Sequence, residues 1–217
     1  MKTIEVTLFS YGELSETAQA NARDIWRNQT EPSFGMEEEI REHFQYTLSE
    51  LGYTEQCDRR DTCGLNALYS LGYSQGDGVA FQGDFIKSVD KVAKRVLSKK
   101  DYALLNYTHL SGQLKGLKLF DYCDVSVKNS GRYTHWNSFR TSLDLGSLEN
   151  FFDLTTRQFG AIDALTTNIQ EELVALSHQL EKEGYEIIEY QNSDEAVTET
   201  IQANVSGDCF LADGTRA

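Results

Sequence analysis

The chain has 217 residues, a net charge of −14 and a hydrophobic fraction of 40%, with 11% aromatic residues. This length suits one large domain or two small ones, and this composition excludes an intrinsically disordered chain. No apolar run approaches the roughly 20 residues that cross a bilayer, and the opening lacks a secretory signal pattern, so a cytoplasmic protein without membrane contact is expected.

The four cysteines form no C-x-x-C pair and match no common zinc-binding spacing. We therefore expect reduced thiols, no metal site and no cofactor. Cys57 and Cys63 are close in sequence, but a cytoplasmic setting argues against a disulfide between them.

The charge is distributed unevenly along the chain. Residues 144–217 hold 3 Lys+Arg against 15 Asp+Glu, a net −12, whereas residues 1–143 have a net charge of only −2. The nearly neutral part contains a strongly basic segment, KSVDKVAKRVLSKK, at 87–100. This uneven charge distribution bears on the protein's partners and solubility rather than on its fold.

The N-terminal part predicts a strand followed by two helices. TIEVTLF at 3–9 alternates apolar and polar residues, which is typical of a strand. Ser15 is the expected N-cap of a helix over 15–28, and Gly52 is expected to stop a second helix over 36–51.

The central part, 65–145, predicts antiparallel strands interrupted by the basic helix. The two flanks of SQGDG, residues 74–78, are expected to pair with each other. Alternating residues over 117–143 predict a second hairpin with its turn at 129–131.

The last third predicts helices rich in acidic residues. An apolar stripe indicates a helix over 161–183 that Gly184 ends, and YEIIEY at 185–190 predicts a short strand. Ser193 is the expected N-cap of a last helix extending to about Asn204, and the chain closes on a short strand, CFLADG.

These elements predict an α+β fold, in which an antiparallel sheet is covered by helices and the acidic C-terminal third is helical. We expect residues 1–217 to form a single domain, with a soft boundary near 144–150 as the alternative. No internal repeat and no low-complexity linker marks a boundary elsewhere.

Four segments together resemble a group of small proteins encoded by bacteriophages and prophages. They are GELSETAQANARD, LGYSQGDGVAF, RYTHWNSF, and the close LEKEGYEIIEYQNSDEAVTETIQAN with FLADG. The most specific block is SQGDG with a following aromatic residue, and the chain departs from the group at Trp136, where an acidic or polar residue is expected. The resemblance implies an accessory phage protein that works inside the bacterial host, and it implies no activity.

The stretch SQGDG has two interpretations. In the first, Gly76 and Gly78 allow successive amides to form an anion-binding nest, and Asp77 acts as a base or holds a cation. In the second, the stretch is a hairpin turn with Gly76 or Gly78 at positive φ, and its polar side chains bond their own backbone. The stretch lacks the lysine of a P-loop and the G-x-G-x-x-G order of a dinucleotide fold, so the turn is favoured.

His135 is predicted to lie in the middle of a strand, with Asn137 on the same face. Pairing of this strand with the SQGDG strands would bring His135 toward Asp77 and Ser74, which are the residue types of a nucleophile with its base. A strand histidine is more often a packing residue, so this set supports only an enzymatic alternative. Under that alternative the catalytic candidates are Ser74, Asp77 and His135, and the ligand-binding candidates are Gln75, Gly76, Gly78 and Asn137.

The basic and acidic segments suggest opposite relations to nucleic acid. The basic helix either meets phosphates or is a surface that is solvated or paired with the protein's own acidic third. Its cationic residues are Lys87, Lys91, Lys94, Arg95 and Lys99. The acidic third either presents carboxylates where a host enzyme expects phosphates or only adds solubility. Its candidates for partner binding are Glu171, Glu172, Glu181 and Glu183.

Two hypotheses of function follow from the sequence. The first, favoured because no catalytic motif is present, is a phage accessory protein that binds a host protein as an acidic inhibitor of a nucleic-acid-handling or defence enzyme. The second is a small enzyme that acts on a phosphate-containing or nucleotide-like substrate at SQGDG and His135. Convergence of Asp77 and His135 in a concave pocket would favour the enzyme, and a flat acidic face would favour the inhibitor.

Overall fold

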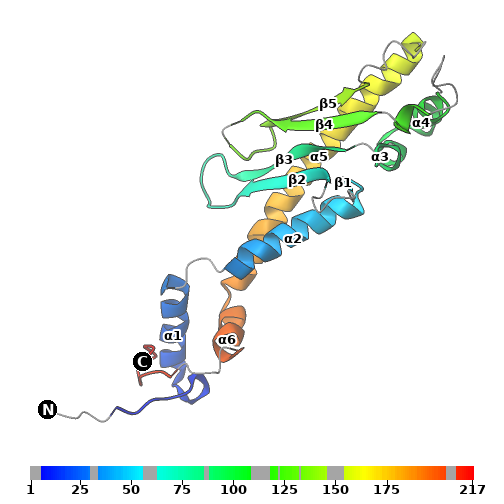
Figure 1. Ribbon diagram of the computed structural model, residues 1–217. Coiled ribbons are helices and arrows are strands. Elements are labelled where there is room, and N and C mark those ends of the chain that lie inside the picture. The colour runs from blue at the N-terminus through cyan, green and yellow to red at the C-terminus, as the bar shows by residue number, and fades with distance from the viewer. Residues whose placement is uncertain are drawn as a thin grey trace. The chain divides into compact units, whose positions relative to one another are not determined.

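The protein has an α+β fold in a computed structural model (Figure 1). The chain divides into two compact units. The sheet unit is Arg41–Gly184, and the terminal unit joins Met1–Ile40 with Tyr185–Ala217. The structure describes residues 6–29, 34–55, 63–85, 88–108, 118–121, 123–131, 133–145, 154–203 and 209–217.

An antiparallel sheet with strand order β1-β2-β3-β4-β5 forms the centre of the sheet unit. β2 and β3 pair from Gly64 opposite Asp84 to Ser70 opposite Gly78, as predicted for the flanks of SQGDG. The β2–β3 and β4–β5 connections lie at the same end of the sheet (Figure 1). The strands are β1 Thr54–Glu55, β2 Cys63–Ser70, β3 Gly78–Phe85, β4 Asp124–Asn129 and β5 Phe139–Asp144.

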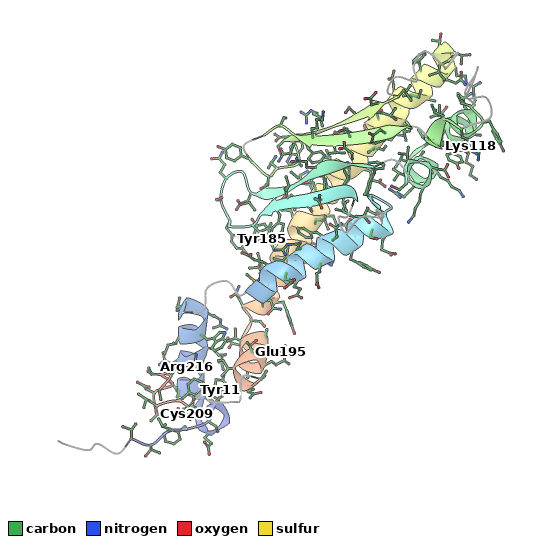
Figure 2. All side chains as sticks on the ribbon, viewed as in Figure 1. Tyr11, Lys118, Tyr185, Glu195, Cys209 and Arg216 are labelled. Atoms are coloured by element: carbon green, nitrogen blue, oxygen red, sulfur yellow. The ribbon has the colours of Figure 1, made fainter. Side chains whose placement is uncertain are left out.

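The helices of the sheet unit occupy one face and one end of the sheet. They are α2 Phe34–Glu50, α3 Val89–Val96, α4 Lys99–Asn106 and α5 Thr156–Gln191, of which α2 and α5 also contribute residues to the terminal unit. α5 crosses one face, where the Ser177 hydroxyl donates to the Val79 carbonyl and the Gln170 side chain accepts from the amide of Thr141. α3, α4 and Lys118 lie at the end of the sheet opposite the two hairpin connections (Figures 1 and 2).

The core of the sheet unit lies between the sheet, α2 and α5. The α5 stripe is buried as its spacing predicts, through Leu165, Ile169, Leu173, Leu176 and Leu180. Aromatic rings join the layers edge to face, with centroids 5.3 Å apart for Phe81 and Phe139 and 5.4 Å apart for Phe44 and Tyr69.

A partly buried polar network fixes α3 and α5 against the start of the sheet. The hydroxyl of the buried Tyr53 donates to Glu172, and Arg95 donates to both carboxylate oxygens of Glu172 at 2.8 and 2.7 Å. Burial raises the pKa of Tyr53. Burial also acts to raise the pKa of Glu172, but the hydrogen bonds from Arg95 and Tyr53 outweigh it, and the pKa lies below its ordinary value.

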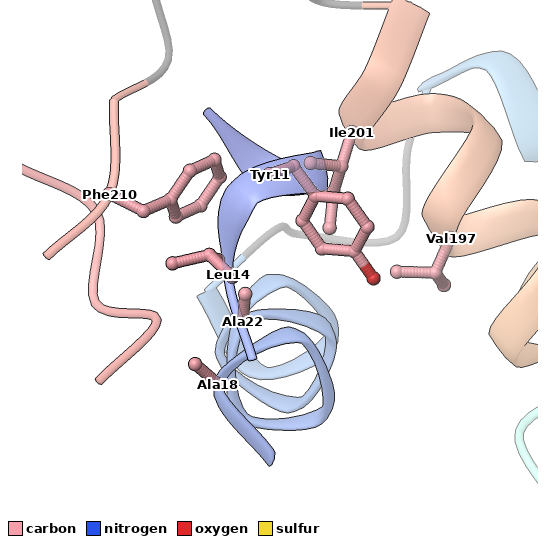
Figure 3. Packing of buried hydrophobic residues seen from close by; sticks show 7 residues of the cluster. All are labelled: Tyr11, Leu14, Ala18, Ala22, Val197, Ile201 and Phe210. Atoms are coloured by element: carbon pink, nitrogen blue, oxygen red, sulfur yellow. The ribbon is translucent and has the colours of Figure 1, made fainter. Parts of the chain in front are cut away.

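The terminal unit brings the two ends of the chain together around a small apolar core. Its elements are a 3-10 turn at Tyr11–Glu13, α1 Glu16–Gln29 and α6 Asp194–Ala203. Figure 3 shows the core cluster of Tyr11, Leu14, Ala18, Ala22, Val197, Ile201 and Phe210. Tyr11, Cys209 and Arg216 lie in this unit (Figure 2).

The expected helix caps of the terminal unit are confirmed. The Ser15 hydroxyl accepts from the amide of Ala18 at 3.3 Å, and the Ser193 hydroxyl accepts from the amide of Ala196 at 3.2 Å. Asp194, in the first turn of α6, also forms ion pairs with two arginines of α1, Arg23 and Arg27.

The strand predicted over 3–9 is wrong in its described part. Residues 6–8 have no strand structure, and Phe9 forms only an isolated bridge with Phe210. Val6 and Leu8 are exposed, so the alternation has no buried face to stabilise a strand. Residues 3–5 lie outside the described residues. CFLADG likewise contributes only the bridges of Phe210.

The end predicted for the long helix and the strand predicted over 185–190 are both wrong, because α5 continues to Gln191. Gly184 is buried inside the helix rather than placed at its end. A Cβ on Gly184 would lie 2.5 Å from Cδ1 of Leu71 and 3.1 Å from Cζ of Phe44. The glycine therefore allows close packing and does not stop the helix.

The second hairpin is confirmed, but its strands are shorter than predicted. β5 begins at Phe139, so His135 lies in a loop and not in the middle of a strand. The part of the first strand around Leu119 forms a 3-10 turn, and residue 117 lies outside the described residues. The predicted basic helix is divided into α3 and α4 because Ser98 caps the second helix through the amide of Asp101.

The described cysteine thiols are free, and no disulfide involves them. Cys123 is buried, and burial raises its pKa to about 12, whereas Cys209 is exposed. Cys57 lies outside the described residues, as does the side chain of Cys63.

Candidate functional site

The connection between β2 and β3, residues 71–77, is held together by the carboxylate of Asp77, and we call it the SQGDG loop. This carboxylate accepts hydrogen bonds from the Ser70 hydroxyl at 2.6 Å and from the backbone amides of Gly72 and Ser74 at 2.8 and 2.6 Å. The Ser74 hydroxyl donates a fourth bond at 3.0 Å. Polar side chains of this stretch therefore bond their own backbone, as the turn interpretation predicts.

Both glycines of SQGDG adopt the backbone conformation expected of the turn. Gly76 has a φ of 99° and Gly78 a φ of 145°. A Cβ on Gly76 would lie 2.8 Å from the ring of Tyr133, and one on Gly78 would lie 3.1 Å from the backbone oxygen of Thr134. The glycines thus serve the turn and also admit the close approach of a second loop.

These bonds assign Asp77 a structural role in the loop. The Ser70 hydroxyl and the Ser74 amide hold the pKa of Asp77 below its ordinary value, although burial acts in the opposite direction. The hydroxyl of Ser74 donates to this carboxylate rather than to a base, so the described contacts do not activate it as a nucleophile.

We expect Asp77→Asn to destabilise the sheet unit by about 2 kcal/mol, because the amide cannot accept all the bonds that the ionised carboxylate accepts. Because the folded-state pKa of Asp77 is depressed, its stabilisation is present above about pH 4 and is lost as the pH falls through the folded-state value. Urea unfolding at pH 7 and pH 3 measures both effects. A loss of stability in the variant that is as large at pH 3 as at pH 7 would contradict this role.

The β4–β5 connection, described at residues 130–131 and 133–138, forms the second loop, which Ser138 organises. The amide of Ser130 donates to the carbonyl of Ser138 at 2.9 Å, and the amide of Ser138 donates to the carbonyl of His135 at 2.9 Å. The Ser138 hydroxyl donates to the same carbonyl at 2.7 Å and accepts from the His135 amide at 3.2 Å. These bonds fold the residues before Phe139 into a loop, which explains why β5 starts late.

The His135 ring is oriented within the second loop by Asn137. Its Nδ1 lies 3.0 Å from Oδ1 of Asn137 and 3.4 Å from the backbone nitrogen of the same residue. Among the described residues, none forms a hydrogen bond with Nε2.

The SQGDG loop and the second loop enclose a pocket of about 610 Å³, which we call the loop pocket. Its volume lies within the range of small-ligand sites. The described residues that line it carry no formal charge when His135 is neutral, and they offer carboxamides, hydroxyls and aromatic rings. They are Gln75, Gly76, Ser130, Gly131, Tyr133, His135, Asn137 and Ser138.

The loop pocket contains some predicted site residues and not others. Gln75, Gly76, His135 and Asn137 converge there from two loops. Ser74 and Asp77 are absent from its described lining because they bond within their own loop, and Gly78 lies at the start of β3.

Both loops carry partly exposed aromatic residues to which sequence reasoning gave no role, and one of them, Tyr133, lines the loop pocket. Tyr73, Tyr133 and Trp136 are 69%, 57% and 37% exposed. The Trp136 ring lies between two imidazoles, with centroids 5.2 Å from His135 and 5.4 Å from His178 on α5. The amino-acid composition of the two loops could have identified these aromatic residues from the sequence. Taken together, the loops combine Tyr, Ser, Gly and Asn with Trp, which is typical of binding loops.

The four acidic candidates do not form one set of free carboxylates. Glu172 binds Arg95 and Tyr53, and Glu183 lies 2.8 Å from Nε2 of His43. Glu171 is exposed and Glu181 is half-buried on α5, where a Glu181 oxygen lies 3.4 Å from the position of a Cβ on Gly78. Charge reversal at all four would therefore disturb internal contacts as well as the surface.

The predicted cationic face is also partly engaged by the protein itself. Arg95 donates to the carbonyl of Leu51 as well as to Glu172, and Lys91 donates to the carbonyl of Glu50 at 3.3 Å. Lys94 and Lys99 are exposed on α3 and α4, and Lys87 lies outside the described residues.

Comparisons with known proteins add no assignment, since no family model, no curated protein and no solved structure matches this chain. Within the described residues, no group of three or more His, Cys, Asp or Glu side chains is placed to hold a metal ion. No helix in the described part of the chain has the length and apolarity needed to cross a membrane.

Proposed function

We propose that this chain is a phage accessory protein that binds a host protein in the bacterial cytoplasm and blocks it by occlusion, with the loop pocket as the recognition surface. The observation that carries the proposal is the convergence of two loops at one end of a rigid antiparallel sheet. Loops that a sheet scaffold holds in place can vary in sequence without disturbing the fold, and binding residues are therefore often found on such loops.

The composition of the loops supports a protein partner. Tyrosine and tryptophan supply large contact areas at low cost in conformational entropy, and Ser, Gly and Asn supply adaptable hydrogen bonds. Tyr133 and Trp136 are partly exposed beside a pocket, which is the arrangement of anchor residues at protein interfaces. The net charge of −14 favours fast association with a basic surface, such as that of a nucleic-acid-handling or defence enzyme.

The enzymatic alternative has weaker support. His135 is oriented by Asn137, but the nucleophile predicted for it, Ser74, bonds Asp77 instead. A phosphate-containing substrate also finds no cationic side chain among the described lining residues, although such groups are the usual partners of phosphate.

The proposal is tested by capture of the partner from a lysate of the natural host, with Tyr133→Ala and Trp136→Ala as variants. We expect each variant to capture at least about tenfold less of a protein that wild type retains, because anchor residues dominate binding energy. Tyr107→Ala is the matched control, since Tyr107 is 75% exposed and follows α4 at the other end of the sheet.

Thermal unfolding of all variants separates loss of binding from loss of fold. Undiminished capture by folded Tyr133→Ala and Trp136→Ala would contradict recognition by the loop pocket. Capture lost in Tyr107→Ala alone would place the interface at the end of the sheet that carries α3 and α4.

A further inference from the structure

The backbone of Tyr73, in the SQGDG loop, has a conformation that tyrosine rarely adopts. Its φ of 56° is the only positive φ among the non-glycine residues that the structure describes. In this left-handed region the Cβ of an L residue crowds a backbone carbonyl oxygen, so a bulky side chain is strained there. Glycine would form the same turn without this cost.

The hydrogen bonds of Asp77 hold Tyr73 in this conformation. One carboxylate oxygen, Oδ2, accepts from the amide on either side of Tyr73, from Gly72 at 2.8 Å and from Ser74 at 2.6 Å. The other oxygen accepts from the hydroxyls of Ser70 and Ser74. Because the residues before and after Tyr73 bond the same atom, its φ cannot relax without the loss of a charge-assisted hydrogen bond.

This fixed turn presents the side chain of Tyr73 to solvent. The residue is 69% exposed, although its ring is a large apolar group that burial stabilises. Tyr73 precedes Gln75 by two residues but is absent from the described lining of the loop pocket. Neither the turn nor the core therefore needs a tyrosine here, and backbone strain that the surrounding bonds maintain is typical of functional sites.

We propose that Tyr73 is an anchor residue of the recognition surface, whose ring lies outside the loop pocket and inserts into an apolar pocket of the partner protein. This inference rests on the proposed function, because it names a further contact of that surface and the kind of partner surface that receives it. A ring on a turn that is already fixed loses little conformational entropy on binding. Anchors of this kind fill concave, desolvated pockets on their partners.

A protein pocket is favoured over a nucleic-acid base as the group that receives the ring. Bases also stack on tyrosine, but single-stranded nucleic acids are bound where cationic side chains accompany the aromatic rings. The SQGDG loop contains no Lys or Arg, and its only charged residue is Asp77.

Substitutions at Tyr73 separate the ring from the backbone strain. Tyr73→Ala removes the ring but keeps a Cβ in the left-handed region, whereas Tyr73→Gly removes both. Tyr107 is the matched control, since it is 75% exposed and has a φ of −94°. Glycine relieves no strain at that position and only adds freedom to the unfolded chain.

We expect the midpoint of thermal unfolding to be at least about 2 °C higher in Tyr73→Gly than in Tyr73→Ala, and lower in Tyr107→Gly than in Tyr107→Ala. Of the two tryptophans, Trp26 lies in the terminal unit and Trp136 in the sheet unit, so Trp136 fluorescence in the Trp26→Phe chain reports unfolding of the sheet unit. A midpoint in Tyr73→Gly at or below that of Tyr73→Ala would contradict the strain at Tyr73.

Binding is measured as retention of the host protein that wild type captures from the lysate. We expect Tyr73→Ala and Tyr73→Gly each to retain at least about tenfold less of it. Tyr73→Phe is expected to retain it to within about threefold, because the ring rather than the hydroxyl fills the partner's pocket. Loss of binding in Tyr73→Gly together with a raised midpoint cannot result from unfolding.

Three results would overturn the anchor. Equal losses in Tyr73→Phe and Tyr73→Ala would exclude an apolar pocket, and loss of wild-type capture after nuclease treatment of the lysate would favour a nucleic acid. Undiminished retention by Tyr73→Gly, together with loss in Tyr133→Ala, would refute the anchor and leave the proposed recognition surface standing. Loss in Tyr73→Gly with undiminished retention by Tyr133→Ala and Trp136→Ala would instead refute recognition by the loop pocket.

Discussion

Gly83→Ala is expected to destabilise the sheet unit by about 3 kcal/mol or more, an effect large enough to unfold it under mild conditions. Gly83 lies in β3 opposite Leu65, with a φ of 143° that L side chains rarely adopt. A Cβ at this position would lie 2.2 Å from the backbone oxygen of Gly64. No rotation of a side chain relieves a clash with backbone, so the pairing of β2 with β3 must open.

Urea unfolding followed through Trp136, in the Trp26→Phe chain, measures this effect within the sheet unit. Gly160→Ala is the matched control because Gly160 lies in α5, and no described neighbour outside the backbone of its own helix lies within 4 Å of an added methyl group. Replacement of a helical glycine by alanine stabilises by about 0.5–1 kcal/mol, so the control is expected to move in the opposite direction. A decrease of less than about 1 kcal/mol in the free energy of unfolding of Gly83→Ala would contradict the described contact of β2 with β3.

Gly214→Ala is expected to detach the C-terminal turn from α1 and to cost the terminal unit about 2 kcal/mol or more. Gly214 has a φ of 88°, and a Cβ would lie 2.1 Å from the carbonyl oxygen of Ala18. The turn is closed by the bond from the amide of Gly214 to the carbonyl of Leu211 at 2.9 Å. Its displacement would expose Phe210, which is part of the apolar cluster.

Limited proteolysis and amide hydrogen exchange report this detachment directly. Faster cleavage near residues 209–217 and faster exchange at the amide of Phe9, which donates to the carbonyl of Phe210, are the expected results. Gly12→Ala is the control in the same unit, because no described neighbour lies within 4 Å of its added methyl. Wild-type exchange rates in Gly214→Ala would rule out close docking of the turn on α1.

The sequence predicted structure well wherever one residue determines a local feature. Ser15 and Ser193 are followed by apolar residues at helical spacing, and each caps a helix as expected. Gly76 and Gly78 between two alternating segments predicted a turn with positive φ, and both have it. These features depend on contacts within a few residues, which sequence patterns record.

Prediction failed where distant contacts override the local pattern. Gly184 resembles a helix stop, but the side chains of Phe44 and Leu71 require a glycine there, and the helix continues. YEIIEY was expected to form a short strand, yet it extends an existing helix, where each further residue needs no new nucleation. The residues before Phe139 were expected to belong to a strand, but bonds through Ser138 fold them into a loop.

The candidate site was predictable in its residues and not in its geometry. Gln75, His135 and Asn137 were identified from polar character, but only the pairing of β3 with β4 brings their loops together. The same pairing brings Tyr133 against Gly76, a contact that no local pattern records. We considered a catalytic role for Asp77 because a sequence does not reveal the hydrogen bonds that its carboxylate accepts from the amides of Gly72 and Ser74.

The central claim is that the loop pocket is the surface that contacts the partner. Site-specific photocrosslinking in the natural host tests it directly, with p-benzoylphenylalanine in place of Tyr133 and, in a second chain, in place of Tyr107. Both positions are exposed tyrosines of the sheet unit, at opposite ends of the sheet. Our account predicts a discrete crosslinked protein from position 133 and none from position 107; crosslinks from position 107 alone would contradict it.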